Sequence, residues 1–166
     1  MLTNLLRGKK FNVGFSGGCD SIYAAHILRK YSPTLYHFNH KLTSEDDIIA
    51  EKAQCAAQEL GLTFVQQNCL TAFVKGSKED YCRKQRYEWF STIGGTIITA
   101  HHLGDACESY IMRCLQGNPE YLPIPISSTF GATIVVRPFI NTPKEVINAY
   151  VERNGLTHLI AYILVV

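Results

Sequence analysis

A short glycine-containing loop between a strand-like run and a helix-like run constrains the fold more than any other feature of this chain. Residues 11–15 are apolar and β-rich, residues 16–21 read Ser-Gly-Gly-Cys-Asp-Ser, and a helical pattern follows over 21–30. A glycine pair at such a junction lets backbone N–H groups surround a small anion, and the N-terminus of the helix adds a favourable dipole. The pattern therefore predicts an anion site at the end of a strand in an α/β fold.

The polar residues of this loop indicate which anion it binds. The hydroxyls of Ser16 and Ser21 add donors beside the glycine pair, and the absence of a lysine excludes the phosphate loop of kinases and GTPases. Asp20 would repel a phosphate unless a cation lay between them, so we expect Asp20 to bind Mg²⁺. We interpret the loop as an ATP site that holds the pyrophosphate portion. The residues expected to contact the nucleotide are Ser16, Gly17, Gly18, Cys19, Asp20 and Ser21.

Cys19 occupies the one position of this loop that is neither glycine, serine nor aspartate. A thiol at a helix N-terminus is expected to have a lowered pKa, which would make it reactive. The alternative is a small side chain that only fills space, and we favour this alternative.

Length and composition limit the class of protein. A chain of 166 residues suffices for one domain with a sizeable core, so we expect a single domain over residues 1–166. The net charge is only +2, so any contact with nucleic acid must come from a local patch. The six cysteines form no C-x-x-C pair, the first ten residues do not resemble a signal peptide, and no run is long enough to span a membrane. We expect a cytoplasmic protein with reduced thiols, and no oligomeric state is predicted.

Apolar, β-rich runs alternate with helical patterns along the chain. Strands are expected at 11–16, 34–39, 62–67, 96–101 and 133–139, and helices at 21–30, 44–60, 78–92, 104–116 and 143–154. This alternation predicts a doubly wound α/β fold, with a five-stranded, mostly parallel sheet and helices on both faces. Ligands of such sheets bind at the carboxyl ends of the strands. The loop, Asn39-His40 and His101-His102 all follow strands, so we expect them to converge on one edge.

Several helix boundaries carry capping signals, and one helix has a clear apolar period. The sequences Ser44-x-x-Asp47 and Thr142-Pro143-Lys144-Glu145 are typical of capping boxes. Glycines at 61, 94 and 117 stand where helices are expected to end. A buried stripe on helix 104–116 is predicted from the spacing of Cys107, Tyr110, Ile111, Cys114 and Leu115.

Two clusters of charged and imidazole side chains have more than one interpretation. Arg83 and Arg86 are one helical turn apart and are expected to clamp a phosphate or an RNA backbone, whereas Lys84 is equally well explained as part of a solvated face. A zinc site would draw on His101, His102, Asp105 and Glu108. Adjacent residues of a strand point to opposite faces, so we favour a role for the histidines in positioning substrate or ATP.

These motifs resemble those of the N-type ATP pyrophosphatases, the PP-loop superfamily, whose loop reads S-G-G-x-D-S. Within it, four further stretches are similar to the N-terminal catalytic domain of the tRNA(Ile)-lysidine synthase family. They are His37-Phe38-Asn39-His40, Glu79-x-x-x-Arg83-x-x-Arg86-Tyr87, Thr99-Ala100-His101-His102-x-x-Asp105-x-x-Glu108 and Arg137-Pro138-Phe139.

The resemblance implies an adenine nucleotide alpha hydrolase-like fold and an ATP-dependent ligase that forms a carbon–nitrogen bond. ATP would adenylate O2 of the wobble cytidine in a tRNA, by resemblance the isoleucine tRNA with a CAU anticodon, and the amine of free lysine would then displace AMP and leave lysidine. The implied cofactors are ATP and Mg²⁺. Asn39 and His40 would join the loop in binding the nucleotide. The implied catalytic residues are Asp20, Arg83, Arg86, His102 and Asp105.

The chain departs from the family pattern in three places. Gly104 stands where the family has the first of two consecutive acidic residues. Residues 117–132, which include Pro123 and Pro125, match poorly, and we expect them to form a long variable loop. The sequence ends in the apolar run 160–166, and we expect the Asp-x-[ST]-Asn stretch and the tRNA-recognition region of the family to be absent or truncated.

The sequence is also compatible with two other functions. The same adenylation chemistry would serve to deliver sulfur to a tRNA base, although relatives that do so through an iron–sulfur cluster carry paired cysteines, which this sequence lacks. A non-catalytic ATP-binding paralogue is the other alternative, because Gly104 and the missing region both remove parts of the family pattern.

Overall fold

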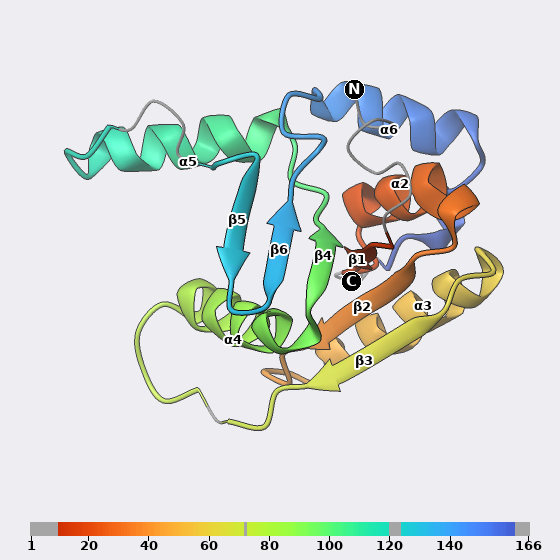
Figure 1. Cartoon of the computed structure of the whole chain (residues 1–166), viewed down its shortest axis with the longest axis horizontal. Coiled ribbons are helices and arrows are strands. Elements are labelled where there is room, and N and C mark those ends of the chain that lie inside the picture. Colours follow the sequence, from red (N-terminus) through yellow and green to blue (C-terminus); the bar gives the residue numbers. More distant parts are fainter. Residues whose placement is uncertain (1–9, 72, 120–123, 162–166) are drawn as a thin grey trace.

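Six strands form one sheet at the centre of the molecule. The structure is a computed structural model that describes residues 10–71, 73–119 and 124–161. Its strands are β1 (Asn12–Gly14), β2 (Thr34–Asn39), β3 (Phe64–Asn68), β4 (Gly95–Ile98), β5 (Ser127–Phe130) and β6 (Thr133–Val136). Their order in the sheet is β3-β2-β1-β4-β6-β5 (Figure 1).

The sheet is parallel except at one edge. β1 pairs with both β2 and β4 in parallel, so the strand order reverses on either side of β1 and the loop after it lies at a topological switch point. β5 pairs with β6 in antiparallel fashion. The mostly parallel sheet is confirmed, but the expected number of five strands is wrong. The sixth strand lies in residues 117–132, expected to be a loop, because the turn at Gly131 and Ala132 folds Ser127–Phe130 back along β6.

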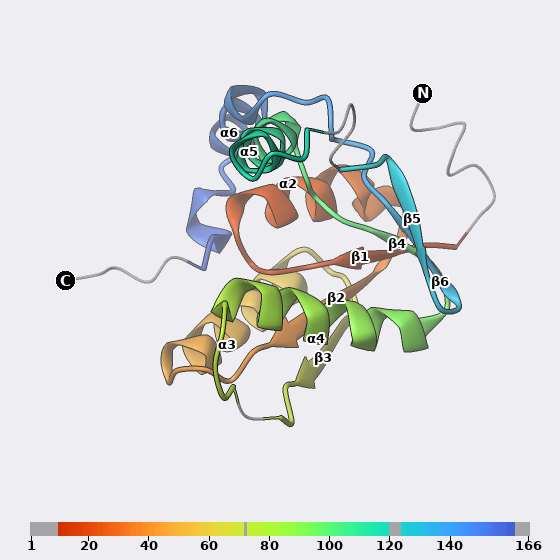
Figure 2. The same cartoon turned by 90° about the vertical axis from the view of Figure 1, so that its left-hand side faces the viewer.

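The helices lie close to their expected positions. They are α2 (Cys19–Leu28), α3 (Glu45–Glu59), α4 (Lys78–Ile93), α5 (Leu103–Leu115) and α6 (Lys144–Arg153), with short 3₁₀ helices at Arg29–Tyr31 and Thr157–Leu159. Figure 2 shows α2, α5 and α6 above the sheet and α3 and α4 below it. Helices therefore cover both faces, as the alternating pattern predicts.

The central strands are buried on both sides, which explains their apolar sequences. Ile97 and Ile98 are adjacent in β4 and therefore point to opposite faces, yet neither is exposed to solvent. Val13 and Ile98 pack with Ile147 of α6 in the larger core cluster. Ile97 packs in a smaller cluster between the sheet and α4.

The buried stripe predicted on α5 is wrong. Within the described structure α5 has no buried residue, and the side chains of Ile111 and Leu115 are 57% and 79% exposed. α5 projects beyond β5 at the edge of the sheet (Figure 1). A helical period marks an apolar face, but it does not specify what packs against that face.

The capping predictions are confirmed in part. Gly61, Gly94 and Gly117 all have positive φ angles at helix ends, which glycine adopts without steric cost. Neither predicted capping box forms, because Ser44 makes no side-chain cap and α6 begins directly after Pro143 without one. A cap that we did not predict lies at α4, where the Ser77 side chain accepts a hydrogen bond from the Asp80 N–H.

The apolar end of the sequence lies only partly within the described residues. Ile160 is buried in the larger core cluster, and the Ala161 N–H donates to Gly17 O at 3.0 Å. The rest of this apolar run, residues 162–166, lies outside the described part of the chain. So do the first nine residues, which the expectation about a signal peptide concerns. Across residues 10–71, 73–119 and 124–161, no helix combines the length and the apolar character that crossing a bilayer requires.

Candidate active site

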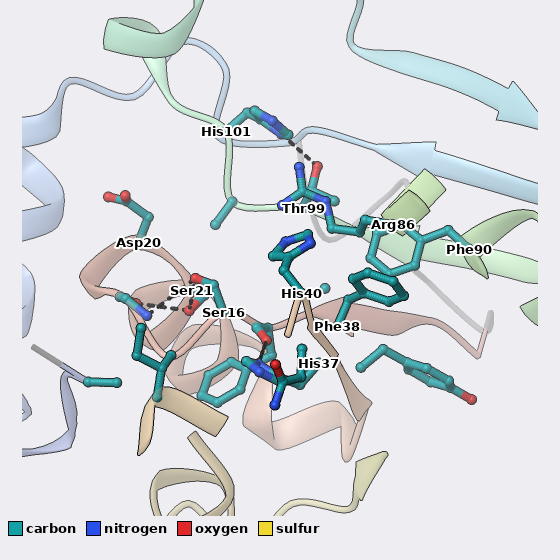
Figure 3. Close-up of a pocket in the computed structure, with 18 of the residues that line it drawn as sticks. Ser16, Asp20, Ser21, His37, Phe38, His40, Arg86, Phe90, Thr99 and His101 are labelled. Atoms are coloured by element: carbon teal, nitrogen blue, oxygen red, sulfur yellow. Dashed lines mark hydrogen bonds between the residues drawn. The ribbon is translucent and has the colours of Figure 1, made fainter. Parts of the chain in front are cut away.

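A cavity of about 460 Å³ lies at the carboxyl ends of β1, β2 and β4. Its wall brings together residues that lie far apart in the sequence. From the predicted site residues it includes Ser16, Gly18, Asp20, Ser21, Asn39, His40, Arg86 and Asp105. In Figure 3 the loop residues lie on one side of the close-up and Arg86 on the other, with His40 between them.

The loop after β1 leads directly into the N-terminus of α2. Gly17 has a φ angle of 83° in the left-handed region, and a Cβ on it would lie 3.1 Å from the Cβ atoms of Ala53 and Ala161, so both its conformation and its surroundings favour glycine. Gly18 is the N-cap of α2 and provides no side-chain cap. The first N–H groups of α2 are therefore available to an anion.

The two serines of the loop fix its shape. Ser16 Oγ donates to Ser21 Oγ at 3.2 Å and accepts from the Gly18 N–H at 3.3 Å. Ser21 Oγ donates in turn to Gly18 O at 2.9 Å. These hydrogen bonds hold the two hydroxyls close to each other at the start of α2, as Figure 3 shows.

Cys19 is turned away from the cavity wall. Its Sγ donates to Asn148 Oδ1 of α6 at 3.4 Å. Burial raises the pKa of the Cys19 thiol, and the nearby Lys144 only partly opposes this effect. The expected lowering of this pKa is therefore wrong, because desolvation is the largest effect and the carboxylates of Asp20 and Glu152 add to it.

Asn39 forms part of the wall and also holds the turn after β2. The residue is 2% exposed, its Nδ2 donates to Asp47 Oδ1 at 2.7 Å, and its Oδ1 accepts from the Lys41 N–H at 3.0 Å. Lys41 Nζ pairs with the same carboxylate at 2.5 Å. Asp47, expected in a capping box, instead fixes the orientation of the Asn39 amide.

Two histidines at the end of β2 are kept neutral by their surroundings. The carbonyl of Phe15 accepts from His37 Nδ1 at 2.9 Å, so this nitrogen carries the proton, and burial lowers the pKa of His37. Burial, followed by the field of Arg86, lowers the pKa of His40 to about 4. His40 Nδ1 is buried without a hydrogen-bond partner in the described structure, which leaves it available to a ligand.

The adjacent histidines after β4 take different positions. His101, which was expected to help position substrate or ATP but is not among the implied catalytic residues, lines the cavity, and its Nδ1 lies 2.9 Å from Thr99 Oγ1. Burial, followed by the field of Arg137, lowers the pKa of His101 to about 4. His102, the predicted catalytic histidine, does not line the cavity and is instead the N-cap of α5.

Gly104 is what allows His102 to cap α5. His102 Nδ1 accepts from the Gly104 N–H at 2.9 Å, and Asp105 Oδ2 accepts from the His102 N–H at 2.7 Å. A Cβ at position 104 would lie 2.6 Å from His102 Cε1. The glycine that stands in place of the acidic residue of the family therefore leaves the space that the His102 imidazole occupies. His102 Nε2 lies 3.9 Å from Asp20 Oδ1, beside the loop.

A second, more polar cavity of about 280 Å³ adjoins the first. Arg86, His101 and Asp105 line both cavities and form the wall between them. The second cavity is also lined by Glu79, Cys82, Arg83, Glu108, Ser109 and Ile124. Arg83, absent from the first cavity, therefore faces this adjoining space.

Arg86 is a desolvated cation in the shared wall. Burial lowers the pKa of its guanidinium, and its charge lies 5.7 Å from the centre of the Tyr87 ring. Within residues 10–71, 73–119 and 124–161, no carboxylate forms an ion pair with it. A half-buried guanidinium without a carboxylate partner is suited to an anionic ligand.

Arg137 organises the structure behind this wall. It is 2% exposed, and its Nη1 donates at 2.9 Å both to Pro125 O and to Ser128 Oγ. Its Nη2 donates to Tyr87 Oη at 3.3 Å. Arg137 thus links the β5–β6 hairpin to Tyr87 of α4, the helix that also carries Arg83 and Arg86.

Asp20 is suited to Mg²⁺ only together with a bound nucleotide. Mg²⁺ is usually held by one or two carboxylates, phosphate oxygens and water, and Asp20 supplies one carboxylate from the loop itself. No group of three or more His, Cys, Asp or Glu side chains among the described residues is arranged to hold a metal ion. In this structure Asp20 pairs with Lys144 of α6, a residue not selected from the sequence.

Curated relatives of the chain are tRNA(Ile)-lysidine synthases. The enzyme of Bacillus subtilis is 30% identical, over 92% of this chain and 36% of its own length. The enzyme of Vibrio parahaemolyticus is 31% identical, over 89% of this chain and 36% of its own length. The enzyme of Mycoplasma mycoides is 25% identical, over 96% of this chain and 43% of its own length. The chain thus spans well under half the length of these relatives.

Solved structures share the fold at low sequence identity. The U34-tRNA thiolase NcsA from Methanococcus maripaludis superposes with a TM-score of 0.74, at 17% identity and over 90% of this chain and 57% of its own. A phosphoadenylyl-sulfate reductase from Candida auris superposes with a TM-score of 0.55 and 11% sequence identity, over 91% of this chain and 75% of its own.

A family model described as a PP-loop domain matches residues 1–160. This range includes the nucleotide loop and the strands and helices that build both cavities. The chain therefore belongs to the PP-loop domain family.

Proposed function

We propose that the chain uses ATP to adenylate the wobble cytidine of an isoleucine tRNA and then joins lysine to that base. The observation that carries the proposal is the arrangement of two adjoining cavities, with the nucleotide loop in one and the unpaired Arg86 in the wall between them. A reaction that brings three substrates together requires one site for ATP and an adjoining site for the acceptor and the amine. The lysidine synthase relatives support this choice of reaction.

In the first step, O2 of the cytidine attacks the α-phosphorus of ATP, and the bond to pyrophosphate breaks. The N–H groups of the loop bind the departing pyrophosphate, and Mg²⁺ held through Asp20 would neutralise part of its charge. Arg86 faces the cavity from the opposite side and is placed to bind the phosphate that is transferred. His40 and His101 stay neutral at pH 7, so they bind the nucleotide or the base by hydrogen bonding without adding charge.

In the second step, the lysine amine attacks C2 of the base, the C2–O bond breaks and AMP leaves. The second cavity carries the carboxylates of Glu79, Asp105 and Glu108, which attract an ammonium group and provide acceptors for the proton that the amine loses. Arg83 in the same cavity is placed to bind a carboxylate or an RNA phosphate. We also propose that the protein acts in the cytoplasm, where its six free thiols stay reduced.

The test is a reaction of the protein with [α-³²P]ATP, lysine and tRNA(Ile) carrying a CAU anticodon. We expect lysine-dependent release of AMP, with lysidine detected in the digested tRNA by mass spectrometry. Arg86→Gln should lower the rate by at least 100-fold, since it removes charge stabilisation of the transition state. Lys84→Gln is the matched control, because Lys84 lies on the same helix but is exposed and paired with Glu88. Absence of both lysine-dependent AMP and lysidine would contradict the proposal.

The same assay separates the alternatives. Release of AMP that depends on a sulfur donor, and not on lysine, would favour transfer of sulfur, a reaction for which Cys82 in the second cavity offers a thiol. Cys82→Ser should leave the formation of lysidine unchanged. Binding of ATP without release of pyrophosphate for any tRNA would favour a non-catalytic module.

A further inference from the structure

The ammonium group of Lys144 contacts the carboxylate of Asp20, although 124 residues separate the two in the sequence. The loop contains no lysine of its own, so the tertiary structure supplies a cation that the local sequence lacks. Lys144 approaches Asp20 from α6 and is 37% exposed, so it is free to change partners.

The N-termini of three helices meet around this ion pair. Asp20 lies in the first turn of α2, and Lys144 is the first residue of α6. The Leu103 N–H at the start of α5 donates to Thr142 O, just before α6, at 3.0 Å. Helix N-termini carry partial positive charge, so a lysine in this place is electrostatically unfavourable unless an anion balances it.

Packing holds Lys144 in this position. The Tyr150 ring of α6 packs edge-to-face against Tyr23 of α2, with ring centres 5.1 Å apart. Tyr150 Oη also lies 2.9 Å from His26 Nδ1. These contacts, together with the hydrogen bond from Cys19 Sγ to Asn148 Oδ1, pack α6 against α2 and keep Lys144 beside the loop that begins α2.

We infer that Lys144 is a catalytic residue that binds the terminal phosphates of ATP and stabilises the pyrophosphate that departs. In the nucleotide-free state Asp20 balances its charge. When the nucleotide binds, Lys144 turns to a phosphate oxygen, and the Asp20 carboxylate that it releases would be free to hold Mg²⁺. The inference rests on the proposed binding of ATP at the loop, but it does not depend on which base or amine is joined.

The test is the binding of inorganic pyrophosphate and of AMP, measured by calorimetry in EDTA so that no metal contributes. Lys144→Met should weaken the binding of pyrophosphate by about tenfold or more, since a charge-assisted hydrogen bond is lost. The affinity for AMP, which lacks the terminal phosphates, should stay within about twofold of that of the unaltered protein. Lys144→Arg should retain most of the affinity. The matched control is Lys84→Met, because Lys84 is exposed, forms an ion pair with Glu88 and lines neither cavity of the site.

A second comparison separates contact with phosphate from mere neutralisation of Asp20. In the Asp20→Asn background the carboxylate charge is absent, so Lys144→Met should still weaken pyrophosphate binding if Lys144 contacts phosphate. An unchanged affinity in that background would overturn the inference, as would an equal loss of AMP binding. These measurements use no tRNA and no lysine. Failure to form lysidine would therefore overturn the proposed function alone.

Discussion

Burial keeps two histidines of the cavity, His40 and His101, uncharged. Their pKa values of about 4 lie well below the usual value near 6.5. Between these two values the unfolded chain binds protons that the folded protein does not bind. The stability that these residues contribute is therefore present above about pH 6.5 and is lost as the pH falls toward 4.

We expect His101→Gln to flatten this dependence. The free energy of unfolding in urea, measured from pH 7.5 to 4.5, should fall less steeply for the variant than for the unaltered protein, by on the order of 1 to 3 kcal/mol across the range. His158→Gln is the control, because Glu59 raises the pKa of the exposed His158 and its contribution has the opposite sign. Identical slopes for His101→Gln and the unaltered protein would show that His101 is protonated normally.

His102 offers a way to separate a capping role from a chemical one. His102→Ala removes the acceptor of the Gly104 N–H and should lower the free energy of unfolding by about 1 kcal/mol. His102→Asn keeps a side-chain acceptor at the N-cap and should retain that stability, so a loss of activity in this variant reports on the imidazole itself. Equal destabilisation by both substitutions in thermal unfolding would contradict the capping role.

At the scale of elements, α5 is the one whose packing differs most from expectation. Because Leu115 is 79% exposed, Leu115→Gln should change the free energy of unfolding by less than about 0.5 kcal/mol. Ile147→Ala on α6 is the buried control and should cost about 2 to 5 kcal/mol, since it leaves a cavity in the core. A loss above about 1 kcal/mol for Leu115→Gln in chemical denaturation would mean that the face of α5 is covered.

Sequence patterns predicted the position of every long helix but not all their ends or surroundings. Glycine C-caps were correct because a positive φ is a local requirement that few residues satisfy. The capping box at Ser44 was wrong because Asp47 forms hydrogen bonds with Asn39 and Lys41 instead. The β5 strand was missed because its partner, β6, rather than its own composition, determines that it is extended.

The whole molecule places two cavities on either side of one wall, and this arrangement makes a kinetic prediction. Glu108 lines only the second cavity, so Glu108→Gln should raise the KM for lysine by about tenfold, as expected when an ion pair with the amine is lost, while the KM for ATP stays within about twofold. Glu88→Gln is the control, because Glu88 lines neither of these two cavities. A parallel rise in both KM values would show that the cavities do not bind separate substrates.

The part of the candidate site that follows from residue chemistry alone is made by one short segment, whereas Asn39, His40 and Asp105, which also line the cavity, were predicted through their resemblance to family motifs. The loop from Ser16 to Ser21 is such a segment, since its glycines and hydroxyls act on their own backbone. Which of the neighbours His101 and His102 lines the cavity could not be predicted, because the start of α5 decides it. Lys144 was missed because it lies on α6, far from the loop in sequence.

The sequence by itself determined the alternation of strands and helices, the mostly parallel sheet and the glycine-containing loop after the first strand. These features depend on backbone sterics and side-chain periodicity, which act over a few residues. Only the tertiary structure decided that α5 is exposed, that Arg86 stands without a carboxylate partner among the described residues, and that Lys144 meets Asp20. These features depend on long-range packing, which sets the burial and the neighbours of each charge and which no local pattern encodes.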